Sequence, residues 1–188
     1  MESWSHFSNE KIRKNSMTYA RSKHSLCTDG RYLYVSGCGG AAKPDKLTPF
    51  SWKNSRSVER YDPLGLQWTV LPRMNEGRTR HSSCCLNEML YVFCGQNFSR
   101  EDMNSIERLD LSKRHQKWHL IYFSSLVLPP CANPSVSAFN SDKILIIGGE
   151  QKLPDGYDKR KFKNGTERLC NMVIFDAKTC MITNDGIN

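Results

Sequence analysis

The sequence predicts an all-β fold assembled from a repeated unit of four short strands. The run Arg78-Thr-Arg-His-Ser82 repeats Arg21-Ser-Lys-His-Ser25 at an offset of 57 residues. The same offset relates Leu90-Tyr-Val92 to Leu33-Tyr-Val35. Self-similarity at a period of this size is the signature of a repeat architecture, so the repeated unit indicates the fold better than the whole chain does.

The first two strands of each unit are joined by a short turn. In the first unit the polar strand His24-Ser-Leu-Cys27 precedes Asp29-Gly30, and the apolar run Arg31-Tyr-Leu-Tyr-Val-Ser-Gly37 follows. Asp-Gly between two such runs predicts a hairpin, because both central residues of a tight hairpin turn need positive φ. The later units have the same order, with turns at Asn87-Glu88 and Asn140-Ser-Asp142.

The third and fourth strands complete the unit. Each third strand closes in an acid, as in Val58-Glu-Arg-Tyr-Asp62, Ile106-Glu-Arg-Leu-Asp110 and Met172-Val-Ile-Phe-Asp176. The fourth strand begins with Trp68 or Trp118 in the first two units, whereas Cys180-Met-Ile-Thr183 has no tryptophan. Four short strands without helical periodicity are typical of a propeller blade.

We therefore predict three blades, over residues 21–74, 78–121 and 132–183, the last with a degenerate fourth strand. Residues 1–20 are expected to be a tail or the outer strand of a preceding blade. Closed propellers contain about four to eight blades, so three predict an incomplete ring. Three explanations stay open: a fragment of a longer protein, a half-propeller that pairs with another copy or chain, and a degenerate protein that stands alone.

These motifs resemble the kelch repeat family, in which an apolar run leads into Gly-Gly and a tyrosine precedes a tryptophan by six intervening residues. The residues that carry the resemblance are the doublet Gly148-Gly149, the single glycines Gly37 and Gly95, the pair Tyr61 and Trp68, and Trp118. The second unit departs from the pattern where Leu109 replaces the tyrosine. The resemblance implies kelch-type β-propeller blades.

The repeat residues have structural explanations. Glycine after the second strand permits close backbone approach where blades crowd the axis. The tyrosine and tryptophans bury aromatic area between neighbouring sheets, so Trp68 and Trp118 are expected in the core. The resemblance implies a non-catalytic protein-interaction module, with substrate receptors of cullin-type ubiquitin ligases and actin-associated scaffolds as family roles. The receptor role would require BTB and BACK segments, which these residues do not contain.

The formal net charge of +8 is unevenly distributed. Much of the excess falls in two insertions, 41–57 and 151–168, each between the second and third strands of a unit. Insertions of this kind commonly form the binding face of a repeat protein, although solvated loops are the alternative. An acidic protein surface or peptide is the expected partner. The predicted contact residues are Lys43, Lys46, Lys53, Arg56, Lys159, Arg160, Lys161 and Lys163.

Other classes of function find little support. The sequence has no run of eighteen apolar residues and no apolar core near Met1, which favours a cytoplasmic protein with reduced thiols. We predict no cofactor and no metal, because Cys-x-x-Cys is absent and His115-Gln-Lys-Trp-His119 lacks the glutamate of helical zinc sites. Two alternatives remain: a fragment of a copper enzyme resembling galactose oxidase, and a basic nucleic-acid-associated protein, for which Lys161-Phe-Lys163 is compatible.

Overall fold

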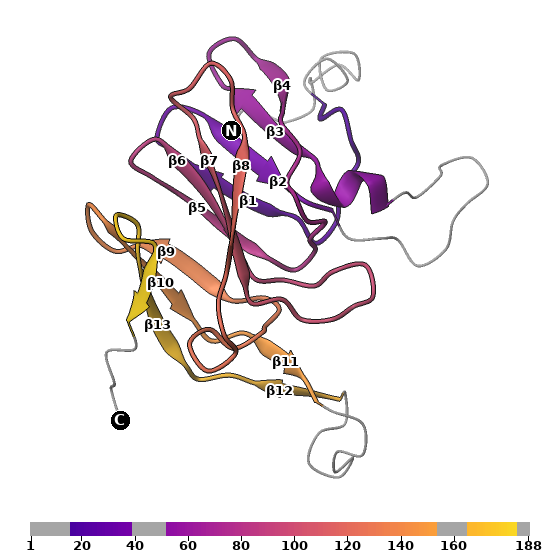
Figure 1. The fold of residues 1–188 in the computed structure, drawn as a ribbon. Helices are drawn as coiled ribbons and strands as arrows, with labels where there is room; N and C mark the ends of the chain where they lie inside the picture. Colours follow the sequence, from indigo (N-terminus) through magenta and orange to yellow (C-terminus); the bar gives the residue numbers. More distant parts are fainter. Residues whose placement is uncertain (1–15, 39–51, 154–164, 184–188) are drawn as a thin grey trace, which may run out of the picture.

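The computed structural model describes residues 16–38, 52–153 and 165–183. These residues form three four-stranded sheets and a two-stranded ribbon, which lie side by side in an open array (Figure 1). Every neighbouring pair of strands is antiparallel. The predicted all-β fold of four-stranded blades is therefore confirmed.

The three sheets follow one another along the chain. Blade 1 contains β1 (Ser25–Thr28), β2 (Leu33–Ser36), β3 (Val58–Asp62) and β4 (Gln67–Leu71). Blade 2 contains β5 (Ser82–Leu86), β6 (Met89–Phe93), β7 (Ser105–Asp110) and β8 (Trp118–Tyr122). Blade 3 contains β9 (Ser135–Ala138), β10 (Lys143–Ile147), β13 (Met172–Asp176) and β14 (Met181–Thr183). A 3-10 helix, η1 (Trp52–Arg56), precedes β3.

The first hairpin does not have the two-residue turn that Asp29-Gly30 predicts. Thr28 pairs with Leu33, so the loop spans 29–32, and within it only Gly30 has positive φ. The Asp29 carboxylate accepts hydrogen bonds from the backbone N–H groups of Arg31 and Tyr32 and closes the wider loop, as Asp side chains commonly do. The tight turn occurs in blade 2 instead, at residues 87–88, where both φ angles are positive.

The second insertion begins and ends as a ribbon rather than as a loop. Its two ends form β11 (Glu150–Lys152) and β12 (Thr166–Arg168). Glu150 pairs with Arg168, and the N–H of Leu153 donates to the carbonyl of Gly165. The two ends of this insertion run antiparallel away from the sheet. Pairing them satisfies backbone groups that a loop would leave to water.

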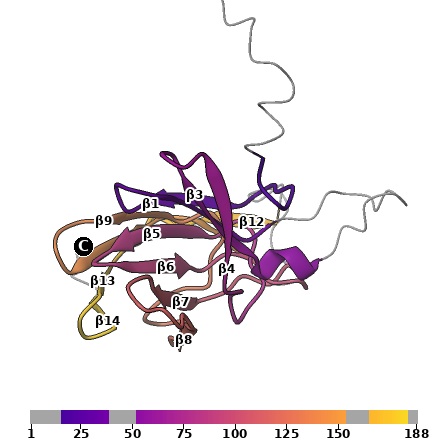
Figure 2. The ribbon, with the colours of Figure 1, turned by 90° about the horizontal axis from the view of Figure 1, so that it is seen from above.

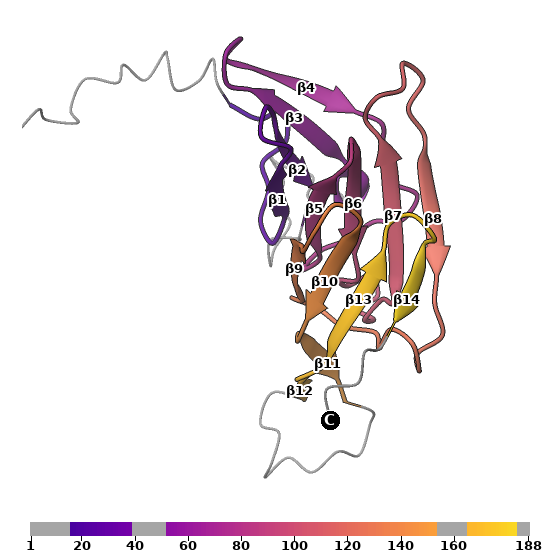
Figure 3. The ribbon, with the colours of Figure 1, turned by 90° about the vertical axis from the view of Figure 1, so that its left-hand side faces the viewer.

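The inner strands β1, β5 and β9 lie next to one another, and the outer strands lie at the far edges of the sheets (Figures 2 and 3). One backbone link recurs between successive blades. The N–H of Arg80 donates to the carbonyl of Lys23, and the N–H of Asn133 donates to the carbonyl of Arg80. All three residues have φ between 51° and 54°. The repeat therefore extends to blade 3, where the sequence letters no longer match.

Two hydrophobic clusters fill the spaces between blades. Side chains alternate along β6, so Leu90 and Val92 face blade 1, whereas Tyr91 and Phe93 face blade 3. On the blade 3 side the rings of Tyr91 and Phe93 pack edge-on against Phe175, with centroids 5.7 and 5.8 Å away. The interfaces between blades are therefore the core of the molecule.

The two tryptophans differ in burial. Trp118 is 3% exposed, and its indole N–H donates to the carbonyl of Pro72 in blade 1. Trp68 is only half-buried and stacks at a tilt on Tyr61, with ring centroids 5.0 Å apart. The prediction that both are core residues holds for Trp118 alone. Trp68 faces away from blade 2, toward a side on which the described residues form no further sheet.

Candidate binding surfaces

The connections between second and third strands gather at one end of the blades, which we call the insertion end (right in Figure 1). Ser55 and Arg56 of blade 1 line one groove together with Phe98 and Met103 of blade 2, in a volume of about 370 Å³. The N–H of Lys152 in β11 donates to the Asp102 carboxylate. Connections from all three blades therefore form one continuous surface.

The predicted partner-binding residues are only partly placed. Lys43, Lys46, Lys159, Arg160, Lys161 and Lys163 lie outside the described residues. Lys53 and Arg56 lie in η1. Arg56 is exposed, and its Nε donates to the carbonyl of Met74 at 2.6 Å. That bond holds a cationic side chain at the rim of the groove.

A second hollow, of about 390 Å³, lies at the insertion end close to the inner strands. It is lined by the two equivalent residues Lys23 and Arg80, together with His24, Asn133 and Glu150. Arg80 Nη1 and Glu150 Oε2 are 3.7 Å apart, and both side chains remain about one-third exposed. An exposed pair of this kind exchanges readily with the charges of a partner because it contributes little stability.

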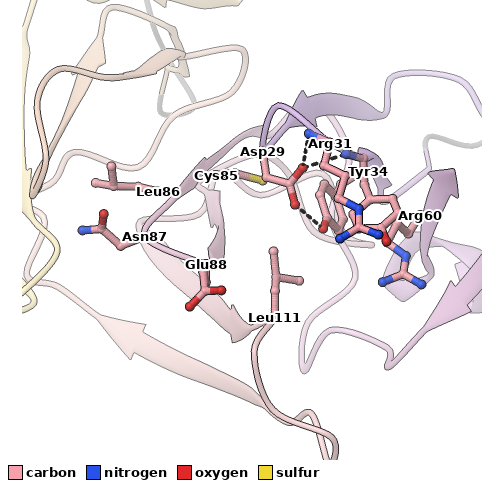
Figure 4. A pocket seen from close by; sticks show the side chains of 10 residues that line it. Asp29, Arg31, Tyr34, Arg60, Cys85, Leu86, Asn87, Glu88 and Leu111 are labelled. Atoms are coloured by element: carbon pink, nitrogen blue, oxygen red, sulfur yellow. Dashed lines mark hydrogen bonds between the residues drawn. The ribbon is translucent and has the colours of Figure 1, made fainter. Parts of the chain in front are cut away.

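The opposite end holds a hollow of about 430 Å³ between the first hairpins of blades 1 and 2 (Figure 4). The guanidinium groups of Arg31 and Arg60 lie 4.8 and 4.4 Å from the centre of the Tyr32 ring. The Tyr34 hydroxyl donates to Asp29 at 2.7 Å, and burial raises the pKa of Tyr34, which keeps that proton in place. Nothing in the sequence pattern had indicated a hollow here, because its residues come from two different repeats.

Two buried ion pairs occupy equivalent positions. Arg78 donates through Nη1 to the carbonyls of Cys94 and Ser105, and its Nη2 lies 3.3 Å from the Glu107 carboxylate. Arg21 and Glu59 form the equivalent pair in blade 1, at 2.8 Å. The repeat in the sequence contained these residues, since both arginines open the duplicated run and both glutamates follow the first residue of a predicted third strand. Their role is structural, because all four side chains are buried.

The glycines after the second strands lie against the linkers between blades, Gly37 against the linker into blade 2 and Gly95 against that same linker from the blade 2 side. Gly37 has φ 68°, and a Cβ there would collide with the His81 ring and the Arg78 carbonyl. At Gly95, with φ 95°, a Cβ would lie 2.7 Å from the Thr79 carbonyl oxygen. The doublet has the same geometry in blade 3, with φ 63° at Gly148 and 116° at Gly149.

His81 is a core residue. Its Nε2 lies 2.9 Å from the Ser36 hydroxyl, and burial lowers the pKa of His81 to about 3. The ring is therefore neutral. Across the described residues, no group of three or more His, Cys, Asp or Glu side chains is arranged to hold a metal ion. In those same ranges no helix is long and apolar enough to cross a bilayer.

Comparison with known proteins agrees with the geometry. The family model described as "Kelch motif" matches residues 20–75 and 77–121. The human "Kelch-like protein 34" is 34% identical over 99 residues, which are 50% of this chain and 15% of that protein. The Danio rerio "Kelch-like protein 15" is 30% identical over 105 residues, 56% of this chain and 17% of that protein. The chain thus aligns with less than a fifth of either relative. It belongs to the kelch-repeat family.

Proposed function

We propose that this kelch-repeat chain is a non-catalytic protein-interaction module that receives an acidic protein surface or peptide at its insertion end. The observation that carries the proposal is the continuous surface formed there by connections from all three blades. Loops on a rigid scaffold are the usual location of binding residues, because they vary without disturbing the core.

The charge of the insertions supports an acidic partner. Arg56, Lys23 and Arg80 are described cationic residues of this end. The cluster at residues 159–163 adds four more basic side chains in sequence. A cationic surface accelerates encounter with an acidic partner, and salt weakens that attraction.

A charge reversal tests the proposed surface. In the double variant Arg160→Glu with Lys161→Glu, we expect capture of cellular partners to fall several-fold at low salt, with a smaller loss at moderate salt. The matched control is Arg114→Glu with Lys117→Glu, which makes the same change of net charge on exposed residues beside β8. Equal capture by wild type and both variants, with the fold intact by circular dichroism, would contradict the insertion end as the binding surface.

The place of the module in a larger assembly is a separate question. A role as substrate receptor of a cullin-type ubiquitin ligase requires BTB and BACK segments in the same protein. Sequencing the full transcript decides between the candidates. A BTB segment supports the receptor role, whereas further blades with copper-ligand motifs would replace the interaction module with an enzyme resembling galactose oxidase.

We also propose that the open face of blade 1 pairs with blade 3 of a second copy. Leu26 and Val70 on this face are 58% and 50% exposed, and Trp68 lies beside them. Blade 2 turns its equivalent face onto blade 1, with Trp118 buried. On blade 3, Ile147 is exposed. Because each chain has one exposed face on blade 1 and another on blade 3, copies can join head to tail.

The pairing predicts concentration-dependent association. Sedimentation velocity should show a larger species for the wild type and a monomer for Leu26→Glu with Val70→Glu. The matched variant Leu64→Glu with Leu66→Glu changes exposed residues of the β3–β4 turn and should still associate. A wild-type chain that stays monomeric at high micromolar concentration would overturn the pairing without affecting the insertion end.

A further inference from the structure

Two cysteines face each other across the boundary between blades 1 and 2. Cys27 is in β1 and Cys85 is in β5, and their sulfur atoms are 3.6 Å apart. Two residues earlier on the same strands, the hydroxyl oxygens of Ser25 and Ser83 are 2.7 Å apart. Serine and cysteine side chains have the same number of atoms beyond Cα. The strands are therefore close enough along this stretch for short side chains to meet.

The pair can be reached from solvent. Cys27 and Cys85 are each half-buried, and Cys85 lines the hollow of about 430 Å³ (Figure 4). Three other cysteines near the boundaries of blade 2, Cys84, Cys94 and Cys131, are less accessible, because all three are buried. Small polar oxidants that enter the hollow thus meet Cys85 and its partner before these other thiols.

We propose that Cys27 and Cys85 are an oxidisable pair that forms a reversible disulfide between blades 1 and 2 on reaction with hydrogen peroxide. The Cys27 thiolate attacks one peroxide oxygen, the O–O bond breaks, and hydroxide leaves. The sulfenic acid at Cys27 is then attacked by the Cys85 sulfur, so that the S–S bond forms, the S–O bond breaks and water leaves. In total, two thiols and one peroxide give one disulfide and two waters.

The hydrogen bond between the thiols assigns the two roles. The Cys85 thiol lowers the pKa of Cys27, and this effect, with a hydrogen bond from Ser83, outweighs burial and the nearby Asp29 charge. The same hydrogen bond raises the pKa of Cys85. The thiolate is the nucleophile, so Cys27 attacks and Cys85 resolves. Bond formation requires the two sulfur atoms to move from 3.6 Å to about 2.05 Å apart.

A second thiol pair at the next boundary serves as an internal comparison. Cys94 of blade 2 and Cys131 of the linker to blade 3 are hydrogen-bonded, and this bond raises the pKa of Cys94. Both residues are buried, at 0% and 2% exposure. Because both thiols are buried and the pKa of Cys94 is raised, this pair should stay reduced under conditions that oxidise Cys27 and Cys85.

The test is disulfide mapping of the folded protein. The reduced chain is treated with equimolar hydrogen peroxide, its free thiols are blocked with N-ethylmaleimide, and it is digested with trypsin without reductant. We expect peptide 24–31 to be linked to peptide 81–100 with the loss of two hydrogens, and dithiothreitol to separate them. Fragmentation distinguishes Cys85 from Cys84 and Cys94, the other two cysteines of peptide 81–100. The closed loop should also raise Tm by about 5–10 °C in the oxidised protein.

Three variants make the outcome decisive. Cys84→Ser should leave the link unchanged. Cys85→Ser should abolish the link and leave a sulfenic acid at Cys27 that dimedone traps, whereas Cys27→Ser should lose both products. The proposal is wrong if Cys94 and Cys131 are linked first, if Cys85→Ser still links the two peptides, or if urea-unfolded chains form the link as fast as folded chains.

Discussion

The boundary between blades 1 and 2 and the boundary between blades 2 and 3 solve one packing problem in two ways. At the first, Arg78 in the linker pairs with Glu107 on the facing strand. At the second, Cys131 and Val173 occupy the equivalent positions and belong to an apolar cluster. The equivalence rests on the backbone, because the Arg78 carbonyl accepts from Cys38 N and the Cys131 carbonyl accepts from Gly95 N.

Each boundary accommodates the side chains at these two positions in a different way. At the first, Arg78 donates to backbone carbonyls as well as to Glu107, so the buried charges are both paired and hydrogen-bonded. At the second, Leu128 and Cys131 are both buried in the apolar cluster, and the two equivalent positions carry no charge. The comparison teaches that the linker residue and the strand residue are exchangeable only together. A change in one alone leaves the other buried charge without its buried partner.

The largest effect should follow from breaking the ion pair. Glu107→Val copies the strand residue of blade 3. It removes the buried partner of Arg78, which keeps only the partly exposed Glu76 carboxylate at 3.0 Å, and it removes the acceptor of the backbone N–H groups of Asn75 and Glu76. We expect the free energy of unfolding to fall by about 3–5 kcal/mol. Urea denaturation followed by tryptophan fluorescence measures the change.

The double variant Arg78→Cys with Glu107→Val sharpens the comparison, because it copies both blade 3 residues at once. It removes the buried Arg78 charge but leaves a cavity, so it should recover part of the stability that Glu107→Val loses. A double variant no more stable than Glu107→Val would show that the two boundaries are not interchangeable in this way.

The next effect concerns the two tryptophans. Trp118→Ala removes a buried ring and its bond to Pro72, and it should cost about 3–5 kcal/mol. Trp68→Ala at the equivalent, half-buried position should cost about 1 kcal/mol. The same denaturation experiment compares them. Equal losses would mean that the open face of blade 1 is covered in solution, for example by a second copy.

The strands were predictable from sequence because the signals that define them are local. Val58–Asp62 and Met172–Asp176 begin and end where the apolar runs and their closing acids predict. The loop at residues 29–32 was not predictable, since the hydrogen bonds that the Asp29 side chain accepts depend on geometry rather than on residue type. The ribbon of β11 and β12 was missed because its strands are short and polar.

The candidate sites were less predictable than the strands, because they are built between repeats. The charge of the insertions was visible in sequence, but the groove beside Arg56 also needs Phe98 from the next blade. Likewise, Cys27 and Cys85 do not occupy the same position in the repeat, because Cys27 aligns with Cys84 at the offset of 57. Their contact follows only from how adjacent blades pack.

The smallest effect is a dependence of stability on pH that separates His81 from His24. The two histidines are equivalent in the repeat, but His81 is buried against Gly37 and His24 is exposed. The pKa of His81 is lowered to about 3 in the folded state, so the unfolded chain binds more protons between that value and the ordinary pKa of 6.5. Stability therefore falls as pH drops through this window.

The test compares unfolding free energies from about pH 7 down to about pH 5, above the range in which the carboxylates titrate. For the wild type the slope should approach, at the acid end, the limit of about 1.4 kcal/mol per pH unit that one proton allows. His81→Gln keeps a polar group beside Ser36 and should remove most of the slope. His24→Gln should change the slope less than His81→Gln does, because His24 is exposed and only partial burial and the nearby Arg21 lower its pKa. If both variants kept the wild-type slope, His81 would not be the neutral core residue that its contacts indicate.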